Sequence, residues 1–239
     1  MNAPKKIGAF FDLDGTLLRP PSLEYRFIAY LLARDEIRVA SVRRWLGYCA
    51  KTLLRDPGGA TLANKRYLAG IHESVVREWA DEVVSSGLPL FGKGIGRVRW
   101  HIERGHQVFV ISGTLAPLAR AIAPYLPGCA EVCGTEVEIV DSYFTGRLVG
   151  AHMSFDVKAR IVRKLAATHA FDLTQSFAYG NEISDAKMLE AVGHPAAVNP
   201  SWKFARTARK RGWIVYKWTQ SHAAQREAGN ALLAAKVAR

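Results

Sequence analysis

The segment 11–18 constrains the fold of this chain more than any other feature. It reads FDLDGTLL and overlaps the end of an apolar run, 7–11, that predicts a short buried strand. Asp12 and Asp14 therefore stand two residues apart where that strand should end, and Gly15 permits a sharp turn. Polar groups at the carboxyl end of a central strand occupy the usual ligand crevice of an open α/β sheet. One acid could act as a nucleophile and the other as a proton donor, with a cation between them, so the segment indicates an enzyme.

Strand and helix patterns alternate in the second half of the chain. Further strands are predicted by apolar runs at 107–111, 176–179, 196–198 and 213–216. Helical periodicity falls between and before these runs, at 94–104, 115–125, 157–168 and 184–192. Residues 131–149 predict short strands around a hairpin, with turn signals at Asp141-Ser142 and Thr145-Gly146. This alternation implies a parallel sheet covered by helices on both faces.

Helical periodicity dominates between the first strand and the alternating region. It follows Arg19-Pro20-Pro21, which interrupts regular structure. Apolar residues then recur at helical spacing over 22–34, 42–49, 62–68 and 74–84, with a strong turn signal at 56–59. We therefore expect a core made of residues 1–18 and 90–239, with residues 19–89 inserted as a small helical subdomain.

Composition sets the broad class of the protein. The chain has 239 residues, of which 49% are hydrophobic, so it can bury a sizeable core. The sequence contains no stretch of about 18 uncharged apolar residues, so it predicts no membrane span. No apolar signal-peptide core follows the first lysines. The three cysteines, Cys49, Cys129 and Cys133, match no zinc spacing and leave one unpaired, so we expect a reduced, cytoplasmic setting.

The carboxyl-terminal part of the chain is strongly basic. The formal net charge is +12, and the residues from Ser201 onward, with nine Lys/Arg and one Glu, supply +8 of it. Such a segment, including a basic extension at 219–239, could contact nucleic acid, anionic lipid or a phosphorylated substrate. A solvated helix face with a frayed end is the simpler interpretation, and we favour it.

Polar clusters follow three of the predicted strands. Besides the two acids, they comprise Ser112-Gly113-Thr114 and Gly180-Asn181 with Asp185, and Lys158 stands near the start of a helix between them. In a parallel sheet these strand ends share one edge. Two acids, a hydroxyl with backbone amides, a lysine and an oxygen-rich pair match the needs of phosphoryl transfer, and hard oxygen ligands suit magnesium.

Taken singly, most of these residues have ordinary structural explanations. Ser112 could cap a helix, Lys158 could lie on the surface, and Asp185 could favour a helix amino terminus through its charge. The two acids could belong to a calcium loop, but Thr16 occupies the fifth position, where that loop needs Asp or Asn. The clusters together, in this order and at strand ends, favour the catalytic interpretation.

These clusters resemble the motifs of the haloacid dehalogenase-like superfamily, in its phosphoserine phosphatase-like branch. Residues 11–16 look like the first motif, 110–114 like the second and 178–185 like the fourth, and Lys158 stands where the third motif has its lysine. The resemblance covers roughly residues 6–218 and implies a Rossmann-like, doubly wound, mainly parallel sheet. The helical insertion 19–89 resembles the helical-bundle cap of that branch.

The resemblance also implies a role for each residue. Asp12 would attack phosphorus and form an aspartyl-phosphate, and Asp14 would protonate the leaving alcohol and then activate water. The phosphate would be bound by Ser112, Gly113 and Lys158. Magnesium would be held by Asp12, the Asp14 backbone carbonyl, Asn181 and Asp185.

The chain departs from the branch at two positions. Asn181 replaces the usual Asp of the fourth motif, which removes a negative charge beside the metal and predicts weaker magnesium binding. Pro21 stands nine residues after Asp12, where phosphoserine phosphatases have a substrate-reading Glu, although Glu24 is close in sequence. This weakens the case for phosphoserine as substrate. Arg66 is our choice, among the many basic residues of the insertion, for a side chain that reaches the substrate.

The sequence therefore predicts a magnesium-dependent phosphomonoesterase acting on a small phosphorylated metabolite. A phosphotransferase or phosphomutase could use the same aspartyl-phosphate, although a helical cap that encloses a small substrate favours hydrolysis. A catalytically weak protein that binds nucleic acid or another anionic surface is the alternative of a different class. The retained Asp12, Asp14, Ser112 and Lys158 argue against it, because a pure binding protein does not need all four.

Overall fold

The computed structural model describes residues 6–37, 43, 47 and 65–218. Most of the helix expected at 42–49, the turn expected at 56–59 and the basic extension expected at 219–239 lie outside the described residues.

A six-stranded sheet forms the centre of the molecule, with the strand order β3-β2-β1-β6-β7-β8. The strands are β1 (Gly8–Phe11), β2 (Gln107–Leu115), β3 (Cys129–Thr135), β6 (Phe177–Gly180), β7 (His194–Val198) and β8 (Ile214–Tyr216). All five pairings between neighbouring strands are parallel. Phe10 in the middle of β1 pairs with Phe109 on one side and Ala178 on the other. The predicted parallel α/β sheet is confirmed, and the strand that precedes the two acids lies in its interior, between β2 and β6.

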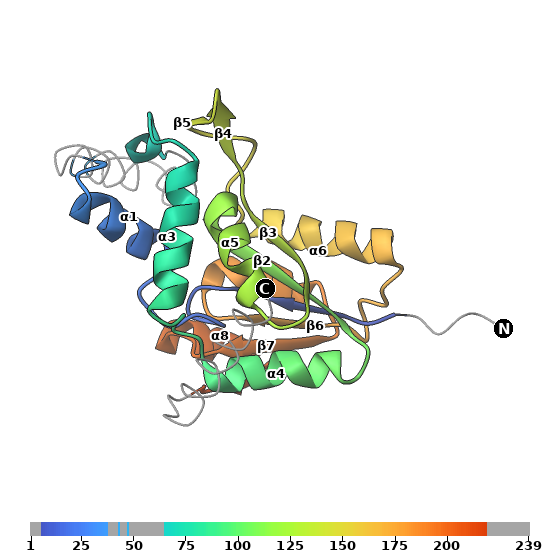
Figure 1. Ribbon diagram of the computed structural model, residues 1–239. Helices are drawn as coiled ribbons and strands as arrows, with labels where there is room; N and C mark the ends of the chain where they lie inside the picture. The colour runs from blue at the N-terminus through green and yellow to red at the C-terminus, as the bar shows by residue number, and fades with distance from the viewer. Residues whose placement is uncertain (1–5, 38–42, 44–46, 48–64, 219–239) are drawn as a thin grey trace.

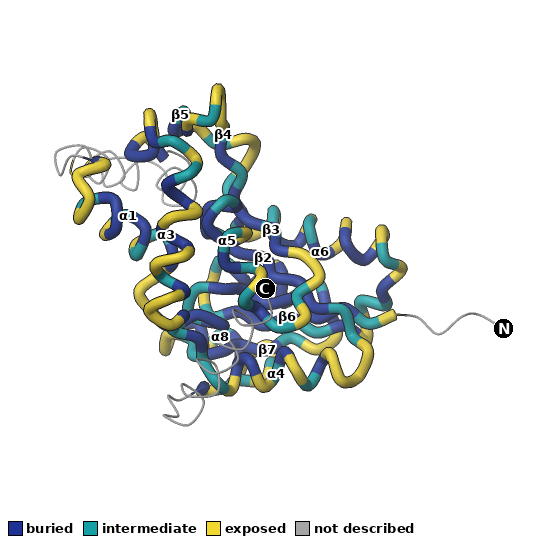
Figure 2. The backbone as a smooth tube through the Cα atoms, in the orientation of Figure 1, coloured by how far each residue is buried: buried dark blue, intermediate teal, exposed yellow. Residues whose placement is uncertain are grey.

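Helices cover both faces of the sheet, as the buried strands and half-exposed helices in Figure 2 show. They are α4 (Gly92–Ile102), α5 (Ala116–Ile122), α6 (Asp156–His169), α7 (Ala186–Glu190) and α8 (Trp202–Lys210). Ala9 and Phe11 of β1 pack into the hydrophobic cluster that includes α4 and α5. Phe10 points to the opposite face and packs with α6, α7 and α8. This alternation along one strand is what a sheet buried on both sides requires.

The segment between β1 and α4 is helical where it is described. It contains α1 (Leu23–Ala33), the short 3-10 helix η1 (Arg66–Leu68) and α3 (Ser74–Ser85). Figure 1 shows α1 and α3 beside α5 at one end of the sheet. The rings of Phe27 and Trp79 join α1 to α3, with centroids 5.3 Å apart. Leu18 and Leu90 form an antiparallel bridge, so the inserted segment 19–89 leaves the core and returns to it at one place.

Residues 129–148 differ from the prediction in two ways. β3 belongs to the main sheet, and only β4 (Val137–Val140) and β5 (Tyr143–Leu148) form the antiparallel hairpin. The hairpin turns at Asp141 and Ser142 as predicted, but the turn expected at Thr145-Gly146 is wrong, because both residues lie within β5. A Cβ at Gly146 would stand 2.9 Å from the Cα of Arg66, so this glycine permits close approach to η1.

The remaining elements are short. The helix predicted at 115–125 consists of α5 followed by the 3-10 turn η2 (Ala123–Tyr125), and the helix predicted at 184–192 begins as the 3-10 turn η3 (Ile183–Asp185) and continues as α7. The described part of the chain contains no helix with the length and apolar character of a membrane span.

Candidate active site

A pocket of about 220 Å³ lies at the carboxyl ends of the central strands β1, β2 and β6. Seven of the eight residues predicted for the site line it, namely Asp12, Asp14, Ser112, Gly113, Lys158, Asn181 and Asp185. Its other lining residues are Ser22, Glu24, Thr114, His152, Met153, Ser154, Glu182 and Ser184. The eighth predicted residue, Arg66, is exposed in η1 and does not line the pocket, so its contact with a substrate stays a prediction.

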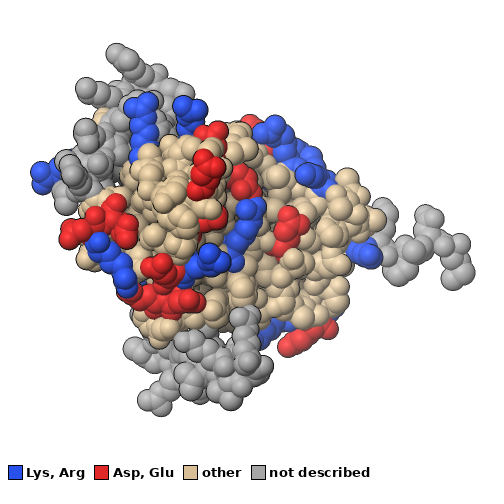
Figure 3. Space-filling view, turned by 45° about the horizontal axis from the view of Figure 1, so that its top comes forward, with Lys and Arg blue, Asp and Glu red and all other residues tan. Residues whose placement is uncertain are grey.

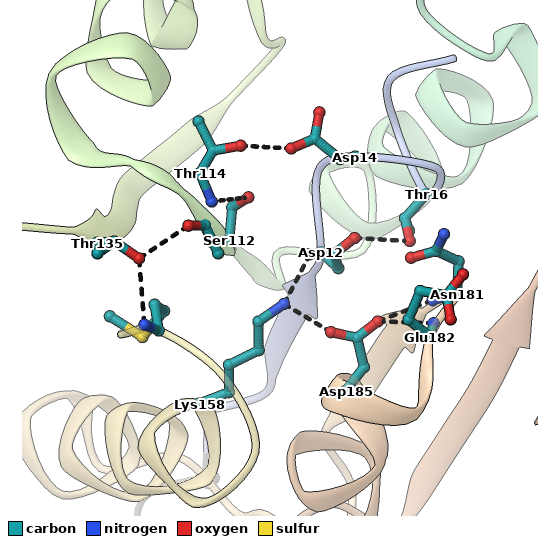
Figure 4. Close-up of polar contacts among 12 residues, drawn as sticks. Asp12, Asp14, Thr16, Ser112, Thr114, Thr135, Lys158, Asn181, Glu182 and Asp185 are labelled. Atoms are coloured by element: carbon teal, nitrogen blue, oxygen red, sulfur yellow. Dashed lines mark hydrogen bonds and ion pairs between the residues drawn. The ribbon is translucent and has the colours of Figure 1, made fainter. Parts of the chain in front are cut away.

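Lys158 is buried on the first turns of α6 and joins two of the acids (Figure 4). Its Nζ atom donates to Asp12 Oδ1 at 2.7 Å and to Asp185 Oδ1 at 2.6 Å. Burial alone would lower the pKa of Lys158, but the two carboxylates outweigh it and raise the pKa above its ordinary value. Lys158 therefore stays charged, and it is a buried cation rather than the surface lysine that the sequence alone could not exclude.

Asp12 follows directly after the last residue of β1 and is 5% exposed. Its Oδ2 atom accepts a hydrogen bond from the Thr16 hydroxyl at 3.1 Å. Burial, and then the charge of Asp185, raise the pKa of Asp12 to about 7, although Lys158 acts in the opposite direction. Thr16 and Lys158 together hold the Asp12 carboxylate at the carboxyl end of β1, where it lines the pocket.

Asp14 is held from two sides. Its Oδ1 atom accepts the Leu23 backbone N–H at 2.7 Å, and its Oδ2 atom accepts the Thr114 hydroxyl. Burial raises the pKa of Asp14, while these two hydrogen bonds lower it. Thr114 belongs to β2 and Leu23 to α1, so one carboxylate is fixed jointly by the core and by the inserted segment.

The turn after β6 is built around Asp185. The Oδ2 atom of Asp185 accepts the backbone N–H groups of Asn181 at 2.9 Å and Glu182 at 3.0 Å, and the Glu182 side chain accepts the backbone N–H of Asp185 in return. This reciprocal pattern is a capping box, and it holds the backbone of Asn181 at the edge of the pocket. Asp185 thus serves both the helix start and the contact with Lys158.

Ser112 and Gly113 lie inside β2 rather than at a helix cap. Ser112 is 1% exposed, and its hydroxyl oxygen accepts the Thr114 N–H at 3.1 Å. The Gly113 carbonyl accepts the Thr135 hydroxyl at 2.8 Å, and that hydroxyl oxygen accepts the Met153 N–H at 3.1 Å. These bonds fix the β2 edge of the pocket against the segment that precedes α6.

The donor set fits a hard divalent cation. The pocket is lined by five carboxylates but only one lysine, Lys158. Among the described residues, no three His, Cys, Asp or Glu side chains are grouped so as to hold a metal ion. A cation here would therefore rely on mixed oxygen ligands: the Asp12 carboxylate, the Asp14 carbonyl and the Asn181 amide. Such a mixed set of oxygens suits magnesium.

Sequence reasoning missed the residues that support and extend the predicted set. Thr16 and Thr114 belong to the motifs but have no predicted role there, and Glu24 is noted only for its closeness to Pro21 in sequence. Lys65 is one of the many basic residues of the insertion, among which Arg66 is our choice instead. His152 gave no signal, because single basic residues in irregular segments are most often exposed. Hydroxyl residues within two positions of a predicted acid or phosphate-binding residue were the one usable signal.

Known proteins resemble this chain over most of its length. The family model of the haloacid dehalogenase-like hydrolases matches residues 9–190. A phosphoserine phosphatase of Mycobacterium tuberculosis is 33% identical over 219 residues, which cover 87% of this chain and 69% of that protein. A probable phosphatase of the same organism is 32% identical over 91% of this chain and 78% of its own length. A crystal structure of a Bordetella pertussis protein of unknown function has a TM-score of 0.77 and 25% identity, and covers 90% of this chain and 100% of that one.

Proposed function

The chain belongs to the haloacid dehalogenase-like hydrolase family, and from that premise we propose that it is a magnesium-dependent phosphomonoesterase that acts on a small phosphorylated metabolite through an aspartyl-phosphate. The observation that carries the proposal is the placement of two differently held acids, Asp12 and Asp14, on one small pocket with Lys158. Relatives named phosphatases support it.

Asp12 is the nucleophile in this proposal. Its carboxylate oxygen attacks phosphorus, the bond between phosphorus and the leaving oxygen breaks, and Asp14 gives its proton to that oxygen. A water molecule then attacks the phosphorus of the aspartyl-phosphate, Asp14 takes a proton from it, and Asp12 and inorganic phosphate are released. The raised pKa of Asp14 suits an acid that must hold a proton before the first step.

Ser112, Gly113 and Lys158 bind the phosphate in this mechanism. Lys158 supplies a fixed positive charge, and Ser112 a hydroxyl that is held in place by Thr114. Magnesium, held by Asp12, the Asp14 carbonyl and Asn181, with Asp185 directly or through water, would neutralise phosphate charge. Because Lys158 already bonds to Asp12 and Asp185, these two acids are oriented before any ligand arrives.

Asn181 in place of the family's Asp lowers the negative charge at the metal site. We therefore expect Asn181→Asp to tighten Mg²⁺ binding, measured by calorimetry without substrate. An unchanged affinity would show that position 181 is not a ligand.

The inserted segment 19–89 acts as the cap in this proposal, with residues 1–18 and 90–239 as the catalytic core. Leu23 and Glu24 bring α1 to the pocket, which supports this division. On the face shown in Figure 3, acidic and basic side chains of the described residues are interspersed rather than gathered in one basic surface. A cytoplasmic location remains part of the proposal, and the free thiols of Cys129 and Cys133 are compatible with it.

The test is phosphate release from an aryl phosphate, with and without Mg²⁺. Asp12→Asn should abolish turnover while circular dichroism shows an intact fold. Full activity in that variant, or no activity in the wild type with Mg²⁺, would overturn the proposed function.

A further inference from the structure

Ser22, Glu24 and His152 are among the polar residues that line the pocket without a part in the phosphoryl chemistry. Ser22 and Glu24 flank Leu23, whose N–H orients Asp14. Because Asp14 faces the leaving oxygen in the proposed mechanism, these residues lie on the leaving-group side. The pocket volume of about 220 Å³ is below the range for drug-sized ligands and suits a small leaving alcohol.

Glu24 is paired with a lysine that lies 41 residues later in the inserted segment. Lys65 Nζ donates to both Glu24 oxygens, at 2.7 and 2.8 Å, and the Tyr67 hydroxyl donates to Oε1 at 2.5 Å. The side chains of Lys65 and Glu24 are 3% and 16% exposed. Separating a buried pair of this kind leaves an uncompensated charge and is strongly unfavourable. Glu24 therefore offers hydrogen-bond acceptors with its charge already balanced.

His152 contributes a nitrogen that no described residue uses. Its Nδ1 atom is buried and has no hydrogen-bond partner within the described part of the chain. The ring packs on the phosphate-binding strand, since a Cβ at Gly113 would lie 3.1 Å from His152 Cε1. Burial, and then the charge of Lys65, lower the pKa of His152 to about 4, so the ring is neutral at pH 7. A neutral imidazole with an unused nitrogen is suited to a hydroxyl group.

Ser22 completes this side of the pocket. Its oxygen accepts the Tyr25 N–H at 3.3 Å as the cap of α1, so its hydroxyl proton can be directed to another acceptor. The three residues thus present hydrogen-bonding groups without a net charge.

We propose that Ser22, Glu24 and His152 bind the leaving group by hydrogen bonds and select an uncharged, hydroxyl-bearing alcohol, because Lys65 balances the charge of Glu24. This inference rests on the proposed phosphomonoesterase function. It names the substrate class as small phosphate esters of neutral diols or polyols, and it excludes esters whose leaving group carries an ammonium or a carboxylate.

Three phosphate esters of nearly equal size test the proposal. They are 2-hydroxyethyl phosphate, O-phosphoethanolamine and phosphoglycolate, whose leaving groups are neutral, cationic and anionic. Wild-type enzyme should hydrolyse the neutral ester with a kcat/KM roughly tenfold or more above both others, since an unmatched charge in a desolvated site is costly. Ethyl phosphate, which lacks the hydroxyl, should be about three- to tenfold poorer than the neutral diol ester.

Variants of the pair should change the ranking in opposite directions. Glu24→Gln removes the negative charge beside Lys65 and should favour phosphoglycolate, whereas Lys65→Met removes the positive charge beside Glu24 and should favour O-phosphoethanolamine. His152→Phe should remove the advantage of 2-hydroxyethyl phosphate over ethyl phosphate. Lys187→Met, which breaks an exposed pair with Glu190, is the matched control and should leave the ranking unchanged.

Each outcome is decisive. A wild-type preference for the cationic or the anionic ester would overturn the inference, whether or not the variants fold. An unchanged ranking in folded Glu24→Gln and Lys65→Met would overturn it too. Wild-type enzyme that hydrolyses an aryl phosphate but shows no preference among the esters refutes only this inference, whereas inactivity on the aryl phosphate as well refutes the proposed function.

Discussion

Gly15 lies directly against the side chain of Asn181, so closely that a Cβ at position 15 would stand 2.0 Å from Asn181 Nδ2. Gly15 also has a φ of +79°, a conformation that other residues adopt only at a cost. The first and fourth motifs therefore meet through a residue without a side chain, and the turn after Asp14 has room for the amide that we propose as a metal ligand.

Gly15→Ala should displace Asn181 and lower both Mg²⁺ affinity and kcat/KM by about 10- to 100-fold, as the loss of a residue that supports a metal site does. Gly70→Ala is the matched control, because Gly70 has a φ of +85° with no atom within 4 Å of an added Cβ. Both variants should lose about 1–2 kcal/mol of stability from backbone strain, and calorimetry should show weaker Mg²⁺ binding in Gly15→Ala alone. Equal Mg²⁺ affinities in the two variants would contradict the assignment of Asn181.

Thr114→Val should lower kcat about tenfold, because Asp14 loses a donor that orients it as general acid. In the wild-type enzyme, the hydrogen bond from Thr114 lowers the pKa of Asp14. Its removal raises that pKa further, so the basic limb of the pH–rate profile should move to higher pH. Thr114→Ser keeps the hydroxyl and should show the wild-type pH–rate profile. If the profile of Thr114→Val does not move, the basic limb does not report the titration of Asp14.

Leu23→Pro should reduce kcat more than Leu23→Ala does. Both variants remove a buried side chain, but only proline removes the N–H that donates to Asp14. Leu23 is the first residue of α1, a position where proline is compatible with the helix. The two variants should therefore have similar melting temperatures and differ in kcat by about tenfold. Equal kcat values would mean that the backbone of the inserted segment does not orient the acid.

Asp12→Asn should stabilise the metal-free protein at pH 8 and have little effect at pH 5. The folded protein holds the proton of Asp12 up to a pKa of about 7, against an ordinary value of 3.8. The folded state therefore loses stability as the pH rises from about 4 through 7, by up to about 4 kcal/mol at 1.36 kcal/mol per pKa unit. Thermal unfolding in the presence of a chelator checks this, and a gain that is the same at both pH values would contradict it.

The sequence predicted most of the fold because its signals were local. The apolar run before Asp12 and the runs at 107–111 and 176–179 each became a central strand of the sheet. Gly146 led to a wrong turn prediction. The glycine permits close approach to the backbone of Arg66, a contact between distant residues that the local sequence does not indicate. The place of β3 in the main sheet depends likewise on pairing with β2.

The site was predictable where spacing after a strand determines the position of a side chain. Asp12, Asp14 and Asn181 follow this rule and line the pocket, whereas Ser112 lines it from within β2, which is longer than predicted. The partner of Glu24 does not follow this rule, because Lys65 and Arg66 are adjacent basic residues that look alike in the sequence. Lys65, which precedes η1, is buried, whereas Arg66, the first residue of η1, is exposed. Pairings between distant parts of the inserted segment depend on packing that no local pattern records.

The hydrogen bond from Leu23 to Asp14 has a consequence for how enzymes of this kind can diversify. The acid is held by a backbone N–H, which any residue except proline can supply, whereas the side chains on either side of it, Ser22 and Glu24, line the pocket. Substitutions at those two positions can change the accepted alcohol while the proton donor keeps its orientation. In the proposed mechanism, catalysis relies on the backbone of Leu23 and selectivity on the side chains of Ser22 and Glu24, so selectivity can change by mutation without loss of chemistry.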